Sequence, residues 1–184
     1  MAKKGEIITN KITGETITWL ATAQDTNGQY LAMDLKVQPL GLAAVNHIHP
    51  DQDEYFLIKK GTIKMQLGSE TKMLNAGDRI VVPKGIPHQW WNPSTTDNLE
   101  MELTFKPALT TEIFFEQFFG LCNDNKNNPD GSFPFWRAIA GLNYYNIFRS
   151  DAPLLVQKFL GYTLGPVARL LGYRAVNPKY STVI

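Results

Sequence analysis

The chain's three histidines and one of its glutamates have the types and spacing that could do chemistry. His47 and His49 stand two residues apart, and His88 follows a turn-forming Pro-x-Gly segment. Residues two apart on a strand point to one face of the sheet, so the first two imidazoles should lie together. Glu54 comes five residues later, past a turn signal, and is expected to open the partner strand of a hairpin. There it could add an oxygen ligand.

Three neutral imidazoles and one carboxylate that converge inside a barrel would suit a divalent transition metal. Such a site keeps a net charge of about +1, and its open coordination positions could polarise an anionic oxygen or bind O₂. The alternative is a vacant or purely structural site.

Several short stretches before Pro107 alternate apolar and polar side chains, and they predict the strands that would carry these residues. They are residues 16–20, 30–37, 62–67 and 99–105, separated by glycine, proline, asparagine or aspartate. This spacing favours an antiparallel sandwich or barrel. His88 should open a strand of a second hairpin, and no helix is expected in this region.

Helical periodicity replaces the alternation after Pro107. A first helix should begin near Thr110 with a wide apolar stripe from 113 to 121, and a second should span 135–148. A third should open at Pro153 and break at Gly165-Pro166, and Gly172 should end a last short one. We expect this tail to pack on the barrel or on a dimer seam; a lid over a ligand pocket is the alternative.

The two segments that hold the candidate ligands resemble the two sequence motifs of the cupin superfamily. Residues 41–61 fit G-x5-HxH-x4-E-x6-G, and residues 77–92 fit G-x5-P-x-G-x2-H-x3-N, at every fixed position. The resemblance covers about residues 6–107 and is to small single-domain bacterial cupins, some of which carry a helical extension. It implies a mainly β fold, an antiparallel double-stranded β-helix (jelly-roll cupin barrel) followed by a C-terminal α-helical extension. The expected boundaries are 1–108 for the barrel and 109–184 for the extension.

The resemblance also implies a ligand set. In such proteins the histidines and glutamate of the first motif and the histidine of the second bind one metal ion. Carried over, the ligands are His47, His49, Glu54 and His88, and the ion is a divalent Fe, Mn, Ni, Cu or Zn. The motif glycines would be turn residues, and Asn92 would end a strand.

Strand parity predicts apolar walls beside these ligands. Trp90 shares the face of His88, and Phe56 and Val45 share those of Glu54 and His47. The predicted substrate-binding residues are Met33, Leu35, Phe56, Trp90, Met101, Leu103 and Phe105. Apolar walls with a metal at one end would favour an aromatic or otherwise apolar substrate with an oxygen handle. The alternative is that these side chains only fill the barrel.

Three functions are compatible with this site. The first is a metal-dependent dioxygenase that acts on a small aromatic or enolic compound, as many cupins do. The second is a redox-neutral isomerase, decarboxylase, lyase or cyclase that uses the metal as a Lewis acid. The third is a non-enzymatic module that binds a small molecule. The sequence offers no clear proton-transfer residue beyond the ligands, and this favours the oxygenase.

Composition limits the partners. Eighteen Lys and Arg against 17 Asp and Glu give a net charge of +1, which offers no electrostatic reason to expect nucleic acid. No apolar run reaches the roughly 18 residues of a transmembrane helix, so no membrane partner is expected. With no signal-peptide segment and one cysteine, Cys122, which we interpret as a packed residue, the expected location is the cytoplasm. We also expect a homodimer, because residues 114–119 are rich in aromatics.

Overall fold

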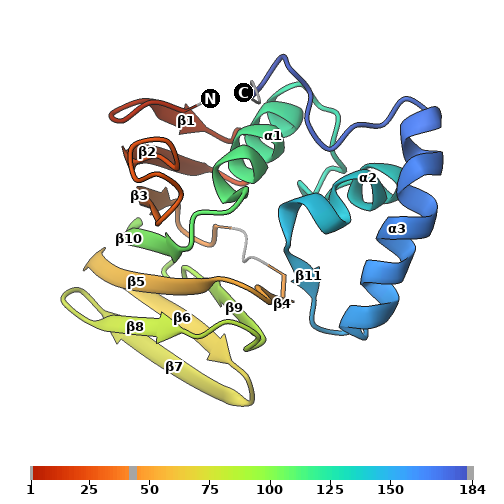
Figure 1. The fold of residues 1–184 in the computed structure, drawn as a ribbon. Coiled ribbons are helices and arrows are strands. Elements are labelled where there is room, and N and C mark those ends of the chain that lie inside the picture. Colours follow the sequence, from red (N-terminus) through yellow and green to blue (C-terminus); the bar gives the residue numbers. More distant parts are fainter. Residues whose placement is uncertain (1, 42–44, 182–184) are drawn as a thin grey trace.

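The computed structural model describes residues 2–41 and 45–181, and two antiparallel sheets form its larger part (Figure 1). The six-stranded sheet has the order β1 (Ile7–Thr9), β2 (Glu15–Ala21), β3 (Leu31–Val37), β10 (Leu99–Lys106), β5 (Asp53–Lys60) and β8 (Arg79–Val82). The five-stranded sheet has the order β11 (Phe148–Arg149), β4 (His47–Ile48), β9 (His88–Trp91), β6 (Thr62–Leu67) and β7 (Glu70–Asn75). The predicted fold, a β-rich jelly roll with C-terminal helices, is confirmed.

The core lies between the two sheets and follows the alternation of the strands. In β10, Leu99, Met101, Leu103 and Phe105 are buried, and the side chains between them are half-buried. The same alternation buries the inward residues of β2, β3, β5 and β6. Alternating apolar residues form strands here because one face of each sheet can then be removed from water.

The chain passes from one sheet to the other between β4 and β5 and again between β8 and β9. The expected hairpins are therefore wrong. β4 pairs with β9 and β11, while β5 pairs with β10 and β8. The turn at Pro50 therefore takes the chain from one sheet to the other, and the turn at Pro83-Lys84-Gly85 does the same between β8 and β9. Gly85 takes a φ of 79°, a left-handed conformation that glycine adopts at little cost.

Helix α1 (Thr111–Asn123) packs its aromatic residues onto the sheet core. Phe119 is buried in that core, and Phe115 makes an edge contact with Trp19 at a centroid distance of 6.5 Å. Figure 1 shows α1 lying beside the β1–β3 end of the six-stranded sheet. The aromatics that suggested a dimer seam thus pack within the chain, and Cys122 is buried beside them.

The remaining helices form a layer beside the sheets. Helix α2 (Phe135–Tyr145) ends earlier than expected because Asn146 turns left-handed at φ 55°, which frees Phe148 to enter β11. Helix α3 (Leu154–Leu170) continues through Gly165-Pro166, so the expected break is wrong. Pro166 has no N–H, so the carbonyl of Tyr162, four residues earlier, lacks its helical hydrogen bond. Tyr162 is exposed, so water can bond this carbonyl instead. The expected last short helix is therefore part of α3 in the described chain, and Gly172, at φ 86°, follows the end of α3 itself.

None of the helices in the described part of the chain is long and apolar enough to cross a membrane.

Candidate metal centre

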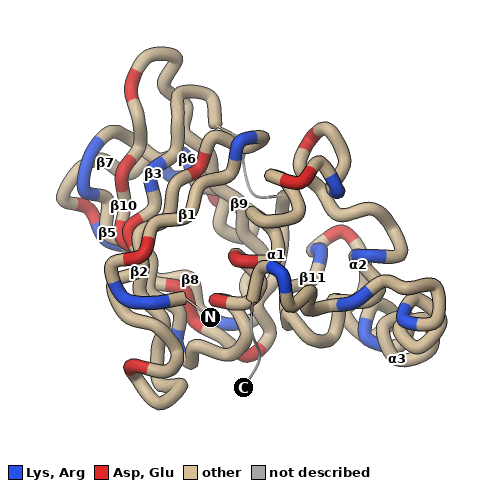
Figure 2. Tube along the Cα trace, turned by 90° about the horizontal axis from the view of Figure 1, so that it is seen from above, with Lys and Arg blue, Asp and Glu red and all other residues tan. Residues whose placement is uncertain are grey.

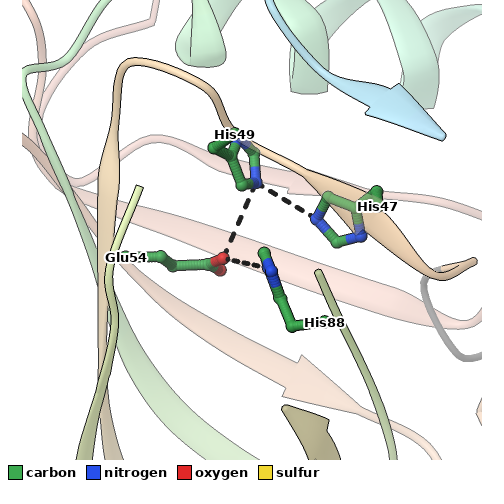
Figure 3. Close-up of side chains that lie close together, drawn as sticks. All are labelled: His47, His49, Glu54 and His88. Atoms are coloured by element: carbon green, nitrogen blue, oxygen red, sulfur yellow. Dashed lines mark hydrogen bonds and ion pairs between the residues drawn. The ribbon is translucent and has the colours of Figure 1, made fainter. Parts of the chain in front are cut away.

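Four side chains from the two motif segments meet between the sheets (Figure 3). His47 and His88 face each other across the β4–β9 pair, His49 lies just past the end of β4, and Glu54 is the second residue of β5. The two motif segments are bonded directly, since the Gly85 N–H donates to the His49 carbonyl at 2.8 Å. The short β4 and the crossing turns therefore bring together all four residues predicted as ligands.

The distances between the ligand atoms fit one cation. His47 Nε2 lies 3.1 Å from His49 Nε2, Glu54 Oε2 lies 2.9 Å from His88 Nε2, and Glu54 Oε2 lies 3.7 Å from His49 Nε2. The four donor atoms all lie within 4.8 Å of one another. Bonds of about 2.1 Å from a central ion place neighbouring ligand atoms roughly 3 Å apart. Three imidazole nitrogens and one carboxylate oxygen suit a divalent transition metal.

Main-chain carbonyls orient two of the rings. The Nδ1 of His47 lies 2.8 Å from the Val45 carbonyl oxygen, and the Nδ1 of His88 lies 3.0 Å from that of Ile86. A proton on each Nδ1 would donate to these carbonyls and leave the Nε2 lone pair directed at the cluster, which is the tautomer that a metal requires. The Nδ1 of His49 is buried without a hydrogen-bond partner among the described residues.

Burial keeps two of the imidazoles neutral. Loss of hydration, with the charge of His88 adding to it, lowers the pKa of His47 to about 3. Burial and the two neighbouring histidines likewise hold the pKa of His49 well below its usual value. Burial also opposes protonation of His88, but the hydrogen bond and charge of Glu54 outweigh it, so the pKa of His88 is raised. His47 and His49 are therefore unprotonated at neutral pH, which is the form that binds a metal.

The seven predicted substrate-binding residues all lie in the sheet core, and each is at most 5% exposed. The ring of Phe105 contacts the cluster, since it lies 5.8 Å from the ring of His49 in an edge contact. Val45, by contrast, is 59% exposed and does not line the interior. β4 begins only at His47, so strand parity does not extend back to Val45. Contact of the seven residues with a substrate remains a prediction.

Some contributors to the site carry no signal in the sequence. The carbonyls of Val45 and Ile86 are main-chain groups, which any residue could supply. Buried Gln52 donates to the Pro107 and Ala108 carbonyls and accepts from the Thr111 hydroxyl, and so ties the turn before Glu54 to the start of α1. Gln52 stands in a polar run, 50–54, whose pattern gives no hint of burial.

Comparison with known proteins gives a family match. Residues 33–105 match the family model described as a cupin domain. Among curated proteins, the chain is 42% identical over 64 residues to an uncharacterized protein, L612, of Acanthamoeba polyphaga mimivirus. It is 37% identical over 57 residues to uncharacterized protein YdbB of Bacillus subtilis (strain 168). The first match covers 33% of this chain and 40% of that protein, and the second covers 30% and 50%, so the chain spans at most half the length of either relative.

Three solved structures are similar in part. The RmlC-like cupin of Shewanella frigidimarina NCIMB 400 has a TM-score of 0.49 and 20% identity, over 59% of this chain and 88% of that one. KdgF of Halomonas sp. has a TM-score of 0.47 and 18% identity, over 55% and 86%. The polyketide cyclase RemF of Streptomyces resistomycificus has a TM-score of 0.47 and 16% identity, over 58% and 78%.

The family match spans the strands β3 to β10, which hold both motifs and the whole histidine and glutamate cluster. Residues 33–105 of this chain therefore form a cupin domain.

Proposed function

We propose that this cupin binds one divalent transition metal and acts as a metal-dependent dioxygenase on a small aromatic or enolic compound. The observation that carries the metal site is the convergence of three imidazole nitrogens and one carboxylate oxygen within 4.8 Å of one another. His47, His49 and His88 would bind through Nε2, and Glu54 through Oε2. A redox-active ion, Fe, Mn, Ni or Cu, would supply the chemistry of O₂ activation there.

The surroundings of the cluster support the oxygenase over acid–base chemistry. Within the described chain, the groups found in contact with these four side chains are two main-chain carbonyls and the ring of Phe105. The carbonyls contact His47 and His88, and the ring contacts His49. None of these groups can accept and return a proton at neutral pH, as a redox-neutral isomerase, decarboxylase or cyclase would require. Apolar side chains around the cluster would exclude water and hold an aromatic or enolic substrate by its hydrophobic part.

The first experiment is elemental analysis of the purified protein, followed by O₂ uptake with a panel of phenolic and enolic compounds. We expect about one redox-active ion per chain and uptake that depends on one class of compound. Zinc with turnover but no O₂ uptake would instead indicate the redox-neutral enzyme, and saturable binding without turnover would indicate a ligand-binding module.

Variants test the ligand set itself. His49→Ala should abolish stoichiometric metal and O₂ uptake while the circular dichroism of the sheets is retained, because the core has its own apolar packing. The control is Glu15→Gln, which changes another buried carboxylate, on β2 and outside the cluster. Full metal content in His49→Ala, or equal loss in the control, would contradict the proposed site.

A further inference from the structure

Helix α3 is apolar on both of its faces. One face carries Gln157, Gly165 and Ala168, which are buried, and packs against Ile139 and Ala140 of α2. The other face, here called the outer face of α3, points away from the protein. Its apolar side chains are Leu155, Val156, Phe159, Tyr162, Val167 and Leu170.

The outer face is unusually exposed for such side chains. Leu155 is 80% exposed, Phe159 64%, Tyr162 73% and Leu170 88%. They recur at helical spacing over the whole length of α3, which is about 25 Å at 1.5 Å per residue. A helix that is apolar all round is normally covered on all sides, and a continuous exposed apolar patch marks an interaction surface.

The charges around this face indicate what covers it. Helix α3 contains no Asp or Glu, and Lys158 and Arg169 lie three turns apart on the same flank of the outer face. Residues 131–184 carry six Lys or Arg and a single acid, Asp151, which forms an ion pair with Arg149. Residues 1–130, by contrast, carry 12 basic and 16 acidic residues. Figure 2 shows the basic residues along α2 and α3. The helical layer is thus basic on an otherwise acidic molecule.

We infer that the outer face of α3 binds the surface of an anionic lipid bilayer. The helix would lie in the plane of the interface, with Leu155, Phe159 and Leu170 entering the boundary between headgroups and acyl chains. Arg169 would reach anionic headgroups with its charged end, and half-buried Lys158, whose Nζ lies 5.7 Å from the centre of the Phe148 ring, would add positive charge beside them. A second copy of this chain fits less well, because pairing two outer faces would bring two basic surfaces together without an acid on either helix.

This mode of contact is compatible with the absence of a spanning helix among the described residues, because an interfacial helix does not cross the bilayer. The expectation of no membrane partner rested on the lack of a long apolar run, which does not bear on a helix that lies on the surface. The inference is independent of the metal site, which is built from other side chains.

The experiment is co-sedimentation of the purified full chain with vesicles of phosphatidylcholine alone or mixed with phosphatidylglycerol. Partitioning onto the mixed vesicles should be about tenfold stronger than onto phosphatidylcholine and should weaken as salt is raised. The triple variant Leu155→Ser, Phe159→Ser, Leu170→Ser should lose about tenfold or more in partitioning. The double variant Lys158→Gln, Arg169→Gln should lose the preference for anionic vesicles.

A matched control changes exposed apolar residues elsewhere. Met73 and Val81, on β7 and β8, are 52% and 44% exposed, and Met73→Ser with Val81→Ser should partition like the unchanged protein. Circular dichroism checks that each variant is folded. Two results would overturn the inference: no sedimentation with anionic vesicles, or equal sedimentation of the triple variant. Light scattering that shows a dimer converted to a monomer by the triple variant, without vesicle binding, would assign the face to a second copy.

Discussion

The three histidines of the cluster differ in how readily they take up a proton. Burial depresses the pKa of His47 to about 3 and also lowers that of His49, whereas Glu54 raises that of His88. An imidazole in water has a pKa near 6.5. We therefore expect His88 to be the first of the three to be protonated as the pH falls.

The metal affinity should therefore depend on a single proton through the neutral range. His47 and His49 stay neutral there, and protonated His88 must release its proton before the ion binds. Below the raised pKa of His88, the dissociation constant should rise about tenfold for each unit of acidification. Chelator competition between pH 5 and 8 measures this slope. A three-proton slope near pH 6.5, or no slope, would contradict the assignment.

Glu15 is a buried carboxyl outside the cluster, and it affects stability in the opposite sense from an ordinary surface acid. Burial raises the pKa of Glu15 to about 7, although a hydrogen bond from the Thr13 hydroxyl partly opposes this. Its ordinary value is 4.5. The folded state holds the proton more tightly than the unfolded state, so the wild type should lose stability as the pH rises from about 4.5 to 7.

Glu15→Gln should remove this loss, because the amide has no charge to bury. The free energy of unfolding of the variant should exceed that of the wild type at pH 8 by up to about 3 kcal/mol more than at pH 4.5. Urea unfolding at the two pH values measures the difference. A gain that is the same at both would show that ionisation of Glu15 is not its source.

At the scale of elements, the helical extension holds the strand that carries His47. β11 pairs with β4, and Arg149 lies directly opposite His47. Gln157 of α3 bonds the free edge of β11: its side-chain amide donates to the Arg149 carbonyl at 2.8 Å and accepts from the Arg149 N–H at 3.0 Å. A chain of contacts thus runs from α3 through β11 to a predicted metal ligand.

Gln157→Leu should weaken metal binding by about tenfold, since removing groups that orient a ligand typically costs 10–100-fold in affinity. Buried Gln117 is the matched control, because it bonds the N–H and carbonyl of Asn177 in the same two-point way. Gln117→Leu should cost similar stability in thermal unfolding and leave the metal affinity unchanged. If both variants or neither changed the affinity, β11 would have no role in positioning His47.

Element types followed from local patterns more reliably than element contacts did. Alternation correctly predicted β10 and β6, and the apolar stripe that begins after Thr110 correctly predicted α1. The break at Pro166 was wrong because the carbonyl that proline leaves unpaired can bond water on an exposed face. The hairpins were wrong because a turn signal does not say to which sheet the next strand belongs.

At the scale of the whole molecule, the sheets and α1 share one core, and α2 and α3 form a second, smaller apolar cluster around Ile139, Ala140 and Ala168. Phe119 of α1 lies in the sheet core, and β11 belongs to the five-stranded sheet. We propose that residues 1–108 and 109–184 are structural divisions that unfold together. The homodimer and the cytoplasmic location remain predictions, and a 20.7 kDa species in light scattering would reject the homodimer.

Scanning calorimetry tests this shared core. The full chain should unfold in one transition whose van't Hoff and calorimetric enthalpies agree, because neither part keeps its apolar surface covered alone. Phe119→Ala should lower the free energy of unfolding by about 3–5 kcal/mol and move the whole transition. Two separated transitions, with only one moved by the variant, would show that the barrel folds independently of α1.

The sequence by itself determined the residue types, the strand alternation and the two motifs, and so the identity of the four clustered side chains. These depend on local spacing, which the chain carries along its length. Only the tertiary structure decided that the strands with the predicted ligands lie in different sheets. It also decided that burial lowers the pKa values of His47 and His49 while Glu54 raises that of His88, and that Gln157 bonds β11, the strand beside β4. Each of these depends on atoms far apart in sequence, whose distance no local pattern records.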